Sequence, residues 1–166
     1  MKPSALVLFS ALTLVPACTE ALSPSQYAGT YLLTGVNSSR LPVTVASLPD
    51  SCTTQFSFGT LYLADGAFSL YYYSAISCPG FPTVVGSNSF GGGLSAQGRT
   101  LVLRAIDPTS PTQAVMEASV TITGAEADLA LPAGALNLAS ATTLDFYNGP
   151  TLQEFPHSAS ALSRSN

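Results

Sequence analysis

The sequence has few charged residues and a single histidine, and both shortages exclude functions. Lysine and arginine together number 5 of 166 residues, against 9 aspartates and glutamates, so no basic surface for nucleic acid is available. The histidine, His157, follows Pro156 near a serine-rich end, so we expect a solvated histidine rather than a general base held rigidly beside a nucleophile. No G-x-S-x-G, P-loop or H-E-x-x-H motif occurs. We therefore expect no nucleic-acid partner, no catalytic residue and no cofactor.

Long apolar runs are also scarce, and the one near the N-terminus is short. Residues 5–15 are uncharged, but a bilayer span takes ~20 residues. The run instead has the form of the h-region of a signal peptide. Val15 and Ala17 suit the small-residue positions before a cleavage site. We therefore expect residues 1–17 to be removed as a signal peptide and residues 18–28 to form a short tether.

The residues around the expected cut, Val-Pro-Ala-Cys at 15–18, resemble the bacterial lipobox, in which an aliphatic and two small residues precede an obligatory cysteine. The resemblance implies a diacylglycerol thioether on Cys18 and a protein anchored in the bacterial cell envelope, at the outer membrane. The alternative is an ordinary secretory signal followed by a free cysteine. The cysteine count favours the lipid, because the chain has 3 cysteines and lipidation of one leaves two to pair in an oxidising compartment.

The other two cysteines, Cys52 and Cys78, flank two apolar-rich runs that predict a β-hairpin. The Ala-Asp-Gly sequence at 64–66 suits a three-residue loop closed by glycine. In that register Cys52 faces Cys78, at a Cα separation that a disulfide spans. A bulge at Gly59, where the apolar phase changes, would displace the register by one residue. A metal site in place of the disulfide lacks ligands, because the one histidine is remote.

From residue 29 onward the sequence consists of short β-rich runs separated by Gly, Pro, Asn and Asp at hairpin spacing. Residues 101–106 and 118–123 alternate in character at period two, as half-buried strands do, and no run has convincing helical periodicity. About eight or nine antiparallel strands with short connections predict an all-β barrel or sandwich. The expected strands are residues 30–36, 42–48, 53–63, 67–77, 83–95, 100–106, 113–123, 127–131 and, with a break, 135–147.

The segments GTYLLTGVN (29–37) and GTLYLADGAFSLYYY (59–73) resemble the small bacterial lipoproteins with a lipocalin-like domain. Gly29, Thr30 and Tyr31 stand where many lipocalins have a glycine, any residue and a tryptophan. The resemblance implies a small antiparallel up-and-down barrel of about eight strands over residues 29–147. Residues 148–166, which contain serine and proline, are expected to form a loose tail.

Three consecutive tyrosines are candidate contact residues, because neighbours in a strand point to opposite faces. Tyr72 shares its face with Phe68, Leu70 and Ile76 and is expected in the core. Tyr71 and Tyr73 share the other face. They form an exposed patch that suits a protein or sugar partner, or they lie under a loop or the tail.

One charge pair is a second candidate. Arg104 and Glu117 are nearly symmetric about Ser110 and Pro111, so they face each other across a predicted hairpin. They form an exposed cross-strand ion pair, or they point inward as a polar anchor in a cavity for an apolar ligand.

Three functions follow as hypotheses. The first is a non-enzymatic, lipid-anchored envelope protein whose domain binds a protein partner or carries a small apolar ligand. The second is a structural factor with a filled core, and the third is a hydrolase with an unrecognised serine. The expected inward side chains are mostly large, which favours a filled barrel and a partner contact outside, near Tyr71 and Tyr73. These inward side chains are Tyr31 or Leu32, Phe56, Phe58, Phe68, Leu70, Tyr72, Leu101, Leu103, Val120, Ile122 and Phe146.

Overall fold

The computed structural model describes residues 21–49, 51–106 and 115–149. The expected signal peptide, Cys18, His157 and residues 150–166 of the expected tail lie outside the described residues. No described helix is long and apolar enough to cross a membrane. The elements are α1 (Pro24–Tyr27), β1 (Gly29–Val36), β2 (Ser39–Arg40), β3 (Val43–Ser47), β4 (Cys52–Ala64), β5 (Ala67–Ser77), β6 (Val84–Gln97), β7 (Thr100–Ile106), β8 (Val115–Thr123), β9 (Glu126–Leu131), the 3-10 helix η1 (Ala135–Asn137) and β10 (Thr142–Tyr147).

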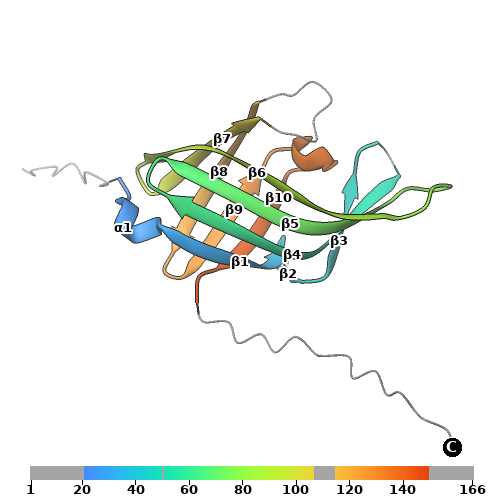
Figure 1. The fold of residues 1–166 in the computed structure, drawn as a ribbon, viewed down its shortest axis with the longest axis horizontal. Helices are drawn as coiled ribbons and strands as arrows, with labels where there is room; N and C mark the ends of the chain where they lie inside the picture. The colour runs from blue at the N-terminus through green and yellow to red at the C-terminus, as the bar shows by residue number, and fades with distance from the viewer. Residues whose placement is uncertain (1–20, 50, 107–114, 150–166) are drawn as a thin grey trace, which may run out of the picture.

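Eight of the ten described strands close into an antiparallel barrel (Figure 1). The strand order is β2-β1-β10-β9-β8-β7-β6-β5-β4-β3, and β1 also pairs with β4, which closes the ring. The two additional strands, β2 and β3, lie outside that ring. The predicted all-β barrel of about eight strands is therefore confirmed, and it is compatible with a lipocalin-like fold.

Alternation of apolar and polar residues decides which side chains fill the barrel. In β5, Phe68, Leu70 and Tyr72 are buried while the residues between them are exposed. β7, β8 and β9 alternate in the same way, and the inward side chains form one core cluster. Burying one such large side chain contributes roughly 1.5–3 kcal/mol. The largest fully buried members are Phe56, Phe146, Leu61, Leu63, Leu70, Leu101, Leu103, Leu129, Leu138, Leu144, Val36 and Val120.

A bulge in β4 places Phe58 on the outer surface. Phe56 pairs with Ser74, but Phe58 pairs with Tyr73, so Ser57 is an extra residue in the strand. Phe56 remains fully buried, whereas Phe58 is 37% exposed. The prediction that Phe58 points inward is therefore wrong, because one inserted residue moves the next side chain to the other face of the sheet.

The same bulge sets the register of the disulfide. Ala64 pairs with Ala67, so residues 65–66 form a two-residue turn in place of the expected three-residue loop. The bulge then shifts the pairing by one residue and brings Cys52 opposite Cys78. The two sulfur atoms are bonded at 2.06 Å and the Cα atoms lie 4.2 Å apart. The predicted disulfide is present because two departures from the expected register cancel.

The segment before β1 packs against one end of the barrel. Tyr27, in α1, is buried, and its carbonyl accepts a 2.9 Å hydrogen bond from the Tyr31 hydroxyl. The N–H of Leu22 donates to the carbonyl of Gly98 at 2.9 Å. Of the two candidates in β1, Tyr31 points inward and is 2% exposed, while Leu32 is half-buried. In Figure 1 α1 lies at the left of the barrel, away from the β5–β6 hairpin at the right.

Candidate functional site

Four exposed aromatic side chains lie on the outer surface of β4 and β5, and we call them the aromatic face. They are Phe58, Tyr62, Tyr71 and Tyr73, with exposed fractions of 37%, 52%, 37% and 41%. Phe58 pairs with Tyr73 across the two strands. Its ring also meets the Tyr71 ring edge to face, with the ring centroids 6.2 Å apart. The bulge at Ser57 therefore adds a third ring beside the two tyrosines that alternation places outside.

The surroundings of the aromatic face carry almost no charge. Asp65 is the only charged residue among residues 52–97, a range that includes β4, β5 and β6. On β6, the cross-strand neighbours of Tyr71 and Tyr73 are Ser89 and Ser87. An uncharged surface gives no electrostatic steering. A partner of this face would therefore be held by ring contacts and hydroxyl hydrogen bonds.

The tyrosine between the two exposed ones lies inside the barrel. Tyr72 is 3% exposed, and its ring centroid lies 5.6 Å from that of Phe56. Phe68 and Phe90 form a second interior ring pair at 6.2 Å. An eight-stranded barrel is just wide enough to be filled by side chains or to hold one small ligand. These rings come from β4, β5 and β6, and they occupy interior space that a ligand would need.

The predicted charge pair lies on the outer surface. Arg104 Nη2 is 3.0 Å from Glu117 Oε2, and the two side chains are 67% and 59% exposed. The residues face each other across β7 and β8. The interpretation as an exposed ion pair is therefore correct, and the interpretation as a polar anchor inside the barrel is wrong. Pairs of this kind contribute about 0.2–1 kcal/mol.

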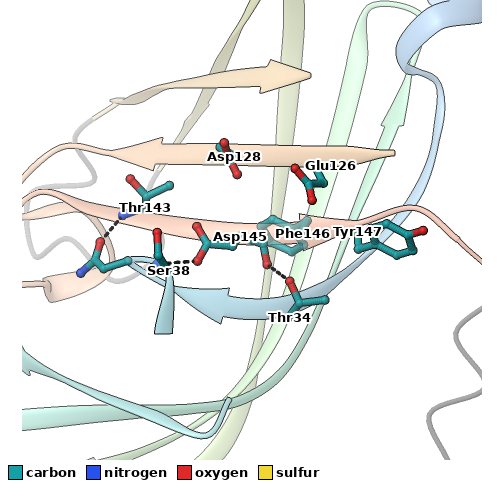
Figure 2. Close-up of a pocket in the computed structure, with 9 residues that line it drawn as sticks. Thr34, Ser38, Glu126, Asp128, Thr143, Asp145, Phe146 and Tyr147 are labelled. Atoms are coloured by element: carbon teal, nitrogen blue, oxygen red, sulfur yellow. Dashed lines mark hydrogen bonds between the residues drawn. The ribbon is translucent and has the colours of Figure 1, made fainter. Parts of the chain in front are cut away.

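A groove of about 620 Å³ lies on the outer side of β1, β9 and β10 (Figure 2). Its acidic residues are Glu126, Asp128 and Asp145. Asp145 and Asp128 face each other directly across β10 and β9, an arrangement that places like charges side by side. Sequence analysis missed this groove because its residues come from three strands whose pairing is set only when the barrel closes.

The carboxylate of Asp145 is an acceptor for the turn between β1 and β2. The Ser38 N–H donates to Asp145 Oδ2 at 2.7 Å, and the Thr34 hydroxyl donates to the Asp145 carbonyl at 3.0 Å (Figure 2). Burial raises the pKa of the Asp145 carboxyl, the Ser38 N–H lowers that pKa, and the charge of Asp128 raises it. Among residues 21–49, 51–106 and 115–149, no group of three or more His, Cys, Asp or Glu side chains is placed to hold a metal ion.

No protein-family model, curated protein or solved structure matches this chain. Fold and surface alone therefore define its class. It is a closed eight-stranded barrel, compatible with a lipocalin-like binding module. Its outer wall carries an aromatic face, of which sequence analysis identified Tyr71 and Tyr73 and missed Phe58 and Tyr62.

Proposed function

We propose that this protein is a non-enzymatic, lipid-anchored protein of the bacterial cell envelope whose barrel binds a partner through the aromatic face. The observation that carries the proposal is the cluster of four exposed rings on one wall of the barrel. Contiguous exposed apolar patches on soluble proteins often mark contact sites, and aromatic residues are enriched in protein interfaces. The hydroxyls of the tyrosines add polar handles to that contact.

The anchor is the proposed lipid on Cys18. After removal of residues 1–17 the chain keeps four arginines, no lysine and nine acidic residues, a net charge of 4 minus 9, or −5. Basic residues would therefore add little to membrane binding, and Cys18→Ser should release the protein from membranes. Intact mass spectrometry of the membrane-purified protein should show cleavage before Cys18 together with acylation. An unmodified N-terminal cysteine, or a Cys18→Ser protein that still pellets with membranes after a salt wash, would refute the anchor.

Carriage of a small apolar ligand inside the barrel is the alternative function. The rings of Phe56, Tyr72 and Phe90 fill part of the barrel interior. We therefore expect a fluorescent fatty-acid analogue to bind weakly and without saturation. Fluorescence titration of the purified protein measures this binding. Saturable, stoichiometric binding in the micromolar range, lost in Tyr72→Ala without loss of folding, would move the function to ligand carriage.

A further inference from the structure

One edge of β6 is open along the part of the strand that leaves the barrel. β6 pairs with β5 from Val84 to Gly93, but with β7 only from Gly93 to Gln97. Within the described part of the chain, no strand pairs with the other side of residues 84–92. Figure 1 shows the β5–β6 hairpin projecting beyond the other strands. An open edge presents a row of backbone N–H and C=O groups that another chain can pair with.

The open edge starts where the backbone of β6 passes very close to that of β7. A Cβ on Gly92 would overlap the carbonyl oxygen of Arg104, so only glycine permits this approach. Beyond Gly92, toward the hairpin tip, β6 follows β5 and no longer pairs with β7. The opening therefore begins at this close approach of the two backbones.

This edge lacks the features that natural proteins use to block strand addition. Residues 84–92, VVGSNSFGG, include neither a charged residue nor a proline, whereas protected edges usually carry lysine, proline or inward-pointing charges. The middle of the edge holds the small side chains of Ser87, Asn88 and Ser89. Neither charge nor bulk therefore opposes a second strand.

Exposed apolar side chains lie at both ends of the open edge. At the hairpin end, Val84 and Val85 are 66% and 54% exposed. At the other end, Ile106 and Val115 are 60% and 65% exposed and face each other across β7 and β8. Ile106 follows by two residues Arg104, which pairs with Gly93 of β6. Two copies related by a two-fold axis meet with opposite ends of their edges together. Val84 and Val85 of one copy then meet Ile106 and Val115 of the other.

We propose that the open β6 edges of two copies of this chain pair antiparallel and join the barrels into a two-fold symmetric dimer. The pairing satisfies the edge backbone groups and covers both apolar clusters of each copy. It also places the two aromatic faces on one continuous sheet, because Ser87 and Ser89 are the cross-strand neighbours of Tyr73 and Tyr71. The occupant of the edge is thus a second copy of the chain.

The mass of the protein in solution tests this proposal. The sample is the chain from residue 18 onward, which contains every described strand, with Cys18→Ser so that no lipid contributes. Sedimentation velocity over a range of concentrations should show a concentration-dependent dimer. Ser87→Lys puts two positive charges close together near the two-fold axis and should weaken dimerisation by at least about tenfold. Ser95→Lys is the matched control, because Ser95 is on the part of β6 that pairs with β7, and it should leave the dimer intact.

Two further measurements keep the test independent of any one variant. Ile106→Ser, on a different strand, should also weaken the dimer, and amide hydrogen exchange of residues 84–92 should slow as the dimer forms. A monomer at all concentrations overturns the proposal, as does a dimer that Ser87→Lys and Ser95→Lys affect equally. Protection of residues 84–92 that does not depend on concentration would assign the edge to another segment of the same chain and also overturns it.

Discussion

Replacing Gly92 by alanine should be far more harmful than the same change at its neighbour Gly93. At Gly92 the new Cβ would overlap the carbonyl oxygen of Arg104, a backbone atom that has no rotamer to escape to. At Gly91 the Cβ would lie 2.6 Å from the carbonyl oxygen of Phe68, and at Gly93 no atom lies within 4 Å. None of these glycines has a positive φ, so the contacts alone distinguish them.

The expected magnitudes follow from these contacts. Overpacking a well-packed site costs about 1–3 kcal/mol, and a clash with backbone places Gly92→Ala at about 3 kcal/mol of destabilisation, with Gly91→Ala within the same range. Gly93→Ala meets no clash and should stabilise the protein by about 0.4–1 kcal/mol, because it restricts the unfolded chain. Urea denaturation followed by circular dichroism gives the free energy of unfolding of each variant.

Equal stability of the Gly92→Ala and Gly93→Ala proteins would refute this reasoning. It would mean that β6 does not pass the backbone of β7 as closely as the contact with Arg104 requires. The close approach at Gly92, where the open edge of β6 starts, would then be absent. The dimer proposal would lose its structural basis as well.

Two further predictions concern the disulfide and the acidic groove. Cys52→Ala combined with Cys78→Ala opens a link between residues 26 apart and should lower the free energy of unfolding by about 3.5 kcal/mol in the loop-entropy model; urea denaturation that shows no loss contradicts it. Asp145→Asn keeps an acceptor for the Ser38 N–H and removes the charge opposite Asp128, so it should stabilise the protein at neutral pH by about 0.2–1 kcal/mol. Because burial raises the folded-state pKa of Asp145, the folded state holds its proton more tightly, and wild-type stability should fall as pH rises from the unfolded to the folded pKa. Thermal unfolding across acidic pH should show a shallower fall for Asp145→Asn, and equal slopes would count against this cause.

Alternation was sufficient to predict the all-β class and most of the core, whereas the choice of a barrel over a sandwich came from the resemblance to lipocalin-like lipoproteins. In β5 the apolar residues Phe68, Leu70 and Tyr72 recur at every second position, and all three are buried. Ile76 has the same phase but is 37% exposed, because it lies near the end of β5, where the hairpin projects beyond the barrel. Phase along a strand predicts the face of a side chain, but not where the barrel around that strand ends.

The exact strand register could not be predicted from local sequence. The change of apolar phase predicts a bulge at Gly59, but the bulge lies two residues earlier, at Ser57, and it carries Phe58 to the outer surface. The expected run 135–147 is also only partly strand. Leu136 and Asn137 have φ values of 53° and 58°, a left-handed conformation that interrupts a strand, and β10 begins at Thr142.

Photo-crosslinking in cells tests most directly the claim that the aromatic face, rather than the barrel interior, meets a partner. A benzophenone amino acid is placed at Tyr71 on β5 or, as a control, at Ala130, an exposed residue of β9. β9 lies four strands from β5 in the eight-stranded ring. We expect an adduct of defined mass from position 71 and none from position 130. No adduct at position 71, or equal adducts at both positions, would contradict the proposed function.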